Sequence, residues 1–194
     1  MKYNTIIPPF ELIRFVDMNK VQAKEYFDWF ISQIDNRINY LHSYIIDDGK
    51  DIVFDYSVES LIPLWEWYEN HISYRELSVD EIESRKNKYP KWMENYISNK
   101  DISFETFKIS LDIAIYFAEV IVRNNPEISW GYFTKPKNRI SVNEPTLLGF
   151  VCDKDLNPRV IVNTCTRRSG REKNKNRLYD IYYVWMEYID KDCC

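Results

Sequence analysis

Two acidic side chains stand inside the most apolar stretch of the chain, and they are the first residues whose types and spacing could do chemistry. Asp112 and Glu119 lie seven residues apart in a segment that is otherwise rich in Ile, Val, Ala and Phe. On a helix this spacing places both carboxylates on one face. If a pocket covered that face, the pair could exchange protons with a substrate, as the acid and base of a hydrolase do.

The same face also has a structural interpretation, which we favour. Tyr116 and Arg123 share it with the two carboxylates, and Glu119 precedes Arg123 by four residues, the spacing of a helical ion pair. Structural ion pairs outnumber catalytic ones. We therefore expect no catalytic residue, and we expect Tyr116, Glu119 and Arg123 to be structural polar residues. Glu119 should be at least partly buried and bonded to Arg123, to Tyr116 or to a group from the strands after Trp130. A hydrolase that uses Asp112 and Glu119 is the alternative.

The segment that carries these residues predicts a long central helix. Ser103 is a good N-cap, and Pro126 cannot continue a helix. Apolar residues cover almost every side of the helix, which indicates that protein surrounds it. Its charged residues argue against a membrane span. The core residues that we expect to be almost fully buried are Phe107, Leu111, Ala114, Phe117, Ala118 and Ile121, together with Trp130 and Trp185.

Spacing elsewhere in the chain predicts the fold class. Helices should begin near Lys20 and after a cap at Ser57 or Ser60, and the segments 130–133, 146–152 and 159–166 are rich in strand formers. Helical spacing returns over residues 178–189. We predict a single α+β domain over residues 1–194, with N-terminal helices, a central buried helix, a three-stranded antiparallel meander and a C-terminal helix.

Charge is distributed unevenly along the 194 residues, whose formal net charge is -4. Residues 1–129 carry 14 basic and 22 acidic groups, whereas residues 130–177 carry 11 basic and 4 acidic groups. The loop 167–177 should be exposed and mobile, and it could steer an acidic protein partner to the molecule. A basic cluster alone is weaker evidence for nucleic acid, and the acidic total opposes that partner. The proposed binding residues are Arg167, Arg168, Arg171, Lys173, Lys175 and Arg177, with Lys135, Lys137 and Arg139.

Other site classes have little support in the sequence. The two histidines, His42 and His71, lie near no nucleophile motif, and there is no glycine-rich phosphate loop. The four cysteines, Cys152, Cys165, Cys193 and Cys194, match no zinc spacing, so we expect no metal and no cofactor. No signal peptide or membrane span is indicated, which predicts a cytoplasmic protein. The tryptophans could line a ligand pocket, but core or interface positions are commoner; those considered are Trp65, Trp67, Trp92, Trp130 and Trp185.

Several segments resemble known families. FDWFISQIDNRINYL, SLIPLWEWYE, SLDIAIYFAEVIV, WGYFTKPKN, VNEPTLLGF and LNPR, in this order, resemble a family of small uncharacterised cytoplasmic proteins from Firmicutes. The central helix with Glu119, the strand with Trp130 and the strand from Pro145 to Phe150 are also similar to immunity proteins of polymorphic toxin systems. This resemblance implies an α+β protein that binds and blocks a toxin, and it implies no catalytic residues.

Overall fold

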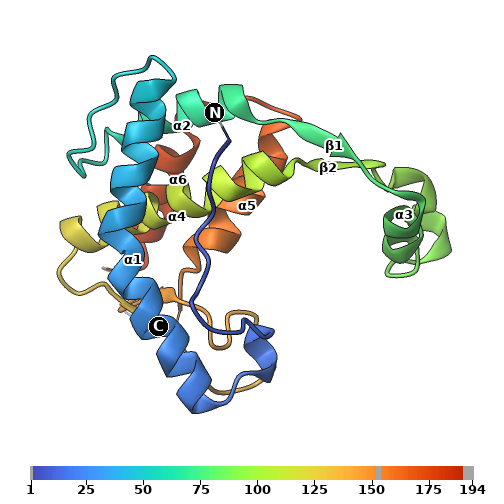
Figure 1. Cartoon of the computed structure of the whole chain (residues 1–194), viewed down its shortest axis with the longest axis horizontal. Coiled ribbons are helices and arrows are strands. Elements are labelled where there is room, and N and C mark those ends of the chain that lie inside the picture. The colour runs from blue at the N-terminus through green and yellow to red at the C-terminus, as the bar shows by residue number, and fades with distance from the viewer. Residues whose placement is uncertain (1, 152–153, 190–194) are drawn as a thin grey trace.

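The computed structural model describes residues 2–151 and 154–189, and helix α4 (Phe104–Asn124) runs through its middle (Figure 1). Ser103 caps this helix, because its side chain accepts a hydrogen bond from the backbone N–H of Thr106 at 3.1 Å. Every residue from Asp112 to Ile121 is buried. The predicted central buried helix is therefore confirmed, and protein covers it on all sides.

Helix α1 (Lys20–Asp47) packs across one side of α4. Asn19 and Gln22 form the predicted capping box, which fixes the start of the helix. One face of α1 is buried, and it consists of Ala23, Ile34, Ile38, Leu41 and Ile45. A short 3₁₀ helix, η1 (Phe15–Asp17), precedes α1, and before it an extended segment of residues 2–14 runs beside α1 and over α4 (Figure 1).

Three further helices complete the body of the molecule. They are α2 (Leu61–His71), α5 (Pro158–Ser169) and α6 (Arg177–Met186). Helix α5 packs against α4, and α6 packs against α2. The apolar face of α2 is fully buried, through Leu61, Leu64, Trp65 and Tyr68. No helix in the described part of the chain is both long and apolar enough to cross a membrane.

The predicted three-stranded meander is wrong. Strands β3 (Ser129–Gly131) and β4 (Thr146–Leu148) form a two-stranded antiparallel sheet, to which Leu156 adds a single bridge opposite Leu147. The expected third strand, 159–166, is helix α5 instead. Its Val and Thr residues suggested a strand, but the side chain of Asn157 caps the helix and Pro158 occupies the first turn. Local start signals therefore outweighed β-branched composition.

A second two-stranded sheet carries a small helical unit away from the body (Figure 1). Strands β1 (Tyr74–Glu76) and β2 (Lys100–Ile102) are antiparallel, and between them lie α3 (Val79–Lys86) and the 3₁₀ helix η2 (Lys91–Tyr96). We call residues 74–102 the arm. No residue of α3 is buried, so this helix is held by its capping box and its contacts with η2 and not by a core.

The predicted core is only partly correct. Ala114, Phe117, Ala118 and Ile121 are buried as expected. The other expected core residues are half-buried, and they are Phe107, Leu111, Trp130 and Trp185. Three of these four, all except Trp185, line a cavity that is described below. The helix periodicity correctly predicted which side of α4 faces the interior. It could not reveal that a cavity lies on part of that side.

This difference predicts unequal losses of stability. Ile113 has no exposed side-chain surface, so Ile113→Ala should lower the free energy of unfolding by roughly 2–5 kcal/mol. Leu111→Ala should cost clearly less, because part of the Leu111 side chain already faces open space. Urea denaturation of both variants measures the two losses, and equal losses would contradict the cavity.

Candidate functional site

Asp112 holds together the N-terminal segment, α1 and α4. Only 1% of it is exposed, and its Oδ1 accepts a hydrogen bond from Arg37 Nε at 3.0 Å while Oδ2 accepts one from Arg37 Nη2 at 2.5 Å. The hydroxyl of Tyr3 donates to the same Oδ2. Arg37 Nη2 also donates to the backbone carbonyl of Asn4 at 2.8 Å. The carboxylate is thus fully engaged by groups that only the folded chain brings together.

Burial dominates the electrostatics of this cluster. It raises the pKa of Asp112, and the hydrogen bonds and positive charge of Arg37 oppose that rise. Burial, together with the negative charge of Asp112, raises the pKa of Tyr3 far above its ordinary value. Tyr3 therefore stays protonated and acts as a hydrogen-bond donor. The arrangement stabilises a buried charge and leaves no free oxygen aimed at a substrate.

Glu119 makes two of the contacts expected from the sequence. Its Oε1 accepts a hydrogen bond from Trp130 Nε1 at 2.8 Å, and its Oε2 accepts one from Arg123 Nε at 3.2 Å. Only 8% of Glu119 is exposed. Because Trp130 lies in β3, the carboxylate joins α4 to the sheet.

Tyr116 makes different contacts. Its hydroxyl lies 2.7 Å from the hydroxyl of Ser60 and accepts a hydrogen bond from the backbone N–H of Tyr56 at 3.2 Å. The carboxylates of Asp112 and Glu119 share no bonding partner among the described residues, and seven residues of helix separate them by about 10 Å along the axis. The geometry therefore gives no support to a catalytic pair.

The predicted basic loop contributes to a hollow that the sequence did not reveal. This hollow, of about 550 Å³, lies between the arm and the end of α5, and we call it the basic hollow. It is lined by Arg85, Lys88, Tyr89, Met93, Ile97, Ser98, Arg167 and Arg171. Four of these residues are cationic and none is acidic, and three others supply apolar surface.

One acidic residue beside the hollow forms ion pairs with two of its cationic side chains. Asp101, in β2, accepts a hydrogen bond from Arg167 at 2.6 Å through Oδ1 and pairs with Arg85 through Oδ2. The basic groups hold the pKa of Asp101 below its usual value although burial opposes them. Lys88 and Arg171 have no ion-pair partner within the described residues, so the hollow keeps an excess of positive charge.

Residues 167–177 are mostly exposed, as predicted, but Ser169 and Arg177 are buried and the segment is anchored to the body, which was not expected. The buried carboxylate of Glu69, in α2, accepts hydrogen bonds from the Ser169 hydroxyl at 2.5 Å and from the backbone N–H of Asn174 at 3.1 Å. Arg177 is also buried, and it donates to the backbone carbonyl of Glu172. The loop is therefore tied to α2. Glu69 is the residue that the sequence analysis missed, since nothing local distinguishes it from a surface Glu.

The remaining predicted basic residues of the loop lie outside the hollow. Arg168 is exposed and pairs with Glu172 at 3.5 Å. Lys173 Nζ donates to the side-chain carbonyl of Asn70 at 3.0 Å, and Lys175 is exposed. Of the six predicted loop residues, Arg167 and Arg171 line the hollow.

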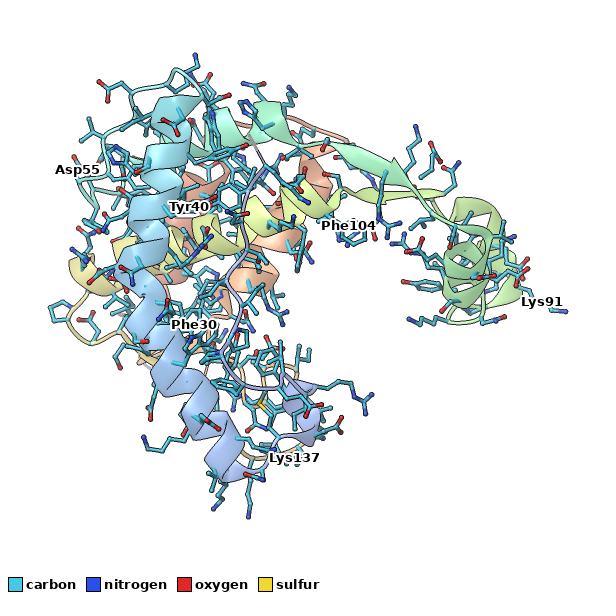
Figure 2. The ribbon with its side chains drawn as sticks, viewed as in Figure 1. Phe30, Tyr40, Asp55, Lys91, Phe104 and Lys137 are labelled. Atoms are coloured by element: carbon cyan, nitrogen blue, oxygen red, sulfur yellow. The ribbon has the colours of Figure 1, made fainter. Side chains whose placement is uncertain are left out.

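The second predicted basic group lies elsewhere. Lys137 Nζ donates to the backbone carbonyl of Met18 at 2.7 Å, close to the N-terminal end of α1 (Figure 2). Arg139 pairs with Asp155 at 2.5 Å, and Lys135 is exposed nearby in the chain. The structure does not bring these residues to the loop, so the two groups do not form one surface. Arg85, near the end of α3, and Lys88, just after that helix, lie at the loop instead.

A separate apolar cavity of about 240 Å³ lies between α1, α4 and the N-terminal segment. Its lining residues are Ile6, Pro8, Leu12, Phe15, Tyr26, Trp29, Phe30, Phe107, Leu111, Ala114, Ile115, Trp130, Glu144, Pro145, Asn157, Pro158 and Arg159. Aromatic spacing in the first 30 residues was the available sequence signal for it. Neither Asp112 nor Glu119 lines this cavity or the basic hollow.

The tryptophans that the sequence pointed to occupy different environments: the core, the cavity wall and the surface. Trp65 and Trp67 are core residues, and Trp130 lines the cavity. Trp92, in the arm, is 72% exposed. Trp185 is half-buried and packs edge-on against Phe150, with ring centroids 5.0 Å apart.

The described residues offer no site for metal or thiol chemistry. No group of three or more His, Cys, Asp and Glu side chains there is arranged to hold a metal ion. Cys165 is buried in α5, and burial raises the pKa of its thiol to about 11. Cys152, Cys193 and Cys194 lie outside the described residues.

Fold and site together define a helical α+β body with a projecting arm and a basic hollow beside it. No protein-family model, no curated protein and no solved structure matches the chain.

The buried Asp112 cluster predicts that the stability of the fold depends strongly on Arg37, the cationic partner of Asp112. Arg37→Met should lower the free energy of unfolding by about 3–5 kcal/mol, because it leaves a buried carboxylate without its cation. The double variant Arg37→Met/Asp112→Leu should recover most of this loss. Denaturant titration of the single and double variants tests the coupling, and additive losses would contradict it.

The same variant predicts a pH effect of defined sign. Without Arg37 the pKa of Asp112 rises further above its unfolded value, so the folded state binds the proton more tightly than the unfolded state does. The stability of Arg37→Met should therefore increase as pH falls toward the ordinary carboxyl pKa of about 4, and decrease as pH rises. Measuring the free energy of unfolding of both proteins at several pH values should show their difference shrinking in acid.

Glu119→Gln should be tolerated better than the change at Arg37. The amide oxygen can still accept the hydrogen bond from Trp130, so we expect a loss of about 1 kcal/mol. Denaturation followed by tryptophan fluorescence measures it. A loss as large as that of Arg37→Met would show that the charge of Glu119, and not its hydrogen bond, holds α4 to the sheet.

Proposed function

We propose that this protein is a non-enzymatic, cytoplasmic binding protein whose basic hollow takes up an acidic segment of a partner protein. The observation that carries the proposal is the convergence of four cationic side chains from two distant parts of the chain, α3 with its flanking turn and the end of α5. Two of them, Lys88 and Arg171, have no ionic partner within the described residues. Carboxylates of a partner would supply the missing charges.

The composition of the hollow favours a protein over a nucleic acid. Tyr89, Met93 and Ile97 give it apolar surface beside the charges, which suits the mixed side chains of a peptide. Arg and Tyr are also the residues that most often dominate binding energy at protein interfaces. The second basic group, near Lys137, lies apart from the hollow, so there is no support for a long basic track along a phosphate backbone.

The arm extends the surface that a partner would contact. Tyr89 and Trp92 are 51% and 72% exposed, and Lys91 between them is labelled at the far end of the arm in Figure 2. Exposed aromatic side chains on a projecting element gain free energy when a partner covers them. A partner that inserted an acidic segment into the hollow would lie against the inner side of the arm.

The particular form of binding that we propose is toxin neutralisation by an immunity protein. Its support is the resemblance of the central helix and the two strands that follow it to such proteins, together with the charged hollow. An immunity protein acts by covering its toxin and needs no catalytic group. The separate partners of Asp112 and Glu119 agree with that requirement.

Charge reversal in the hollow tests the binding proposal. Lys88→Glu/Arg171→Glu changes two exposed cations, so the fold should be retained. The matched control is Lys20→Glu/Lys50→Glu, which changes the net charge equally at exposed sites outside the lining of the hollow. The probes are fluorescein-labelled deca-glutamate and a fluorescein-labelled ten-nucleotide oligothymidylate, followed by fluorescence anisotropy at low salt.

We expect deca-glutamate to bind the native protein and the control, and to bind the hollow variant at least about tenfold more weakly. Absence of peptide binding, or equal binding by the hollow variant, would overturn the proposal. Tighter binding of the oligothymidylate than of the peptide would replace it with a nucleic-acid function. For the immunity form, co-expression with the products of neighbouring genes should rescue growth from a toxic one, and the hollow variant should lose this protection.

A further inference from the structure

The apolar cavity is a second feature of the molecule, and it is independent of the basic hollow. Six of its lining residues are aromatic: Phe15, Tyr26, Trp29, Phe30, Phe107 and Trp130. They come from η1, α1, α4 and β3, so four elements enclose the space from different directions. Phe30 is labelled on the middle of α1 in Figure 2.

The size of the cavity sets it apart from ordinary packing defects. Protein interiors contain few voids larger than a water molecule, and one water needs only about 10–15 Å³ of such volume. The cavity is many times larger, at about 240 Å³. Leu111 and Ala114 line it from the most apolar helix of the chain, where larger side chains would fill it. A partly open space of this kind, apolar with a few polar groups, is the usual form of a small-molecule site.

Polar groups gather at one end of the cavity. Glu144 accepts hydrogen bonds from the side-chain amide of Asn157 at 2.7 Å and from the guanidinium of Arg159. Tyr26 lines the same cavity, and burial raises the pKa of its hydroxyl while the charge of Arg159 opposes that rise. The Tyr26 hydroxyl makes no hydrogen bond to any described residue. This end therefore offers a free hydroxyl beside a balanced pair of charges.

The N-terminal segment forms one wall of the cavity and covers it. Ile6, Pro8 and Leu12 line the cavity. The segment is fixed at one end by the Tyr3–Asp112 hydrogen bond and at the other by Asn143, whose amide donates to the carbonyl of Phe15 at 2.6 Å. Between these ties, residues 5–13 make no hydrogen bond to the rest of the described chain. Apolar contacts hold this stretch against the body, among them those of Phe10 with Tyr26 and Trp29.

We propose that the cavity binds a small, neutral, mostly aromatic molecule that carries one hydroxyl or amide group. The aromatic walls match a flat apolar ring, and the free hydroxyl of Tyr26 matches one polar substituent. A neutral molecule fits because Glu144 and Arg159 already neutralise each other. An ionic substituent would have to displace one partner of this pair or stay unpaired, and an unpaired charge in an apolar site is costly.

Three ligands with the same ring system test the charge preference. They are 1-naphthol, 1-naphthoate and 1-naphthylmethylammonium, each titrated into the full-length protein by isothermal calorimetry. We expect 1-naphthol to bind at least about tenfold more tightly than either ion. Tighter binding of one of the ions, or no heat of binding for any of the three, would overturn the proposal.

Two variants and a control place the ligand in the cavity. Leu111→Trp should fill the space and abolish binding of 1-naphthol, and Tyr26→Phe should weaken it by removing the free hydroxyl. Phe104→Leu is the control, since Phe104 lies on the same helix but is 66% exposed and outside the cavity. Circular dichroism checks that each variant is folded. Unchanged affinity in a folded Leu111→Trp variant would contradict the site, and so would unchanged affinity in Tyr26→Phe should Leu111→Trp fail to fold.

Discussion

The burial of α4 on all sides is the constraint on which the rest of the structure depends. A helix surrounded by protein buries a large apolar area, but it also takes Asp112 and Glu119 out of water. Each carboxylate therefore needs its own donors. Asp112 obtains them from Arg37 and Tyr3, and Glu119 obtains them from Arg123 and Trp130. These pairings fix α1, the N-terminal segment and β3 in their places around the helix.

The same pairings link the core to the apolar cavity. Tyr3 anchors the extended N-terminal segment through Asp112, and a few residues later that segment covers the cavity. Trp130 uses its indole N–H to hold Glu119, and its ring lines the cavity wall. The polar contacts that stabilise α4 therefore also shape the space beside it. Leu111, which was expected in a filled core, borders this open volume instead.

The basic hollow arises from a different principle, the convergence of surface charge. The arm has almost no core. Asp101 at its base pairs with Arg85 within the arm and with Arg167 of α5, and the second pair joins the arm to the body. One acidic residue thereby positions two cations, while Lys88 and Arg171 add charge that the described chain does not neutralise. Unbalanced charge of this kind speeds the encounter with surfaces of opposite charge, and the binding proposal above rests on this property.

The sequence by itself determined the features that depend on neighbours within one helical turn. The caps at Asn19 and Ser103 and the continuous burial of α4 follow from residue types a few positions apart. The misassigned α5 had its signal too, in Asn157 and the proline after it. Only the tertiary structure decided the long-range pairings: Arg37 is 75 residues from Asp112, and the hollow joins segments about as far apart. The spacing of apolar residues determines which face of a helix is buried. The tertiary path of the chain determines which distant side chains contact that face.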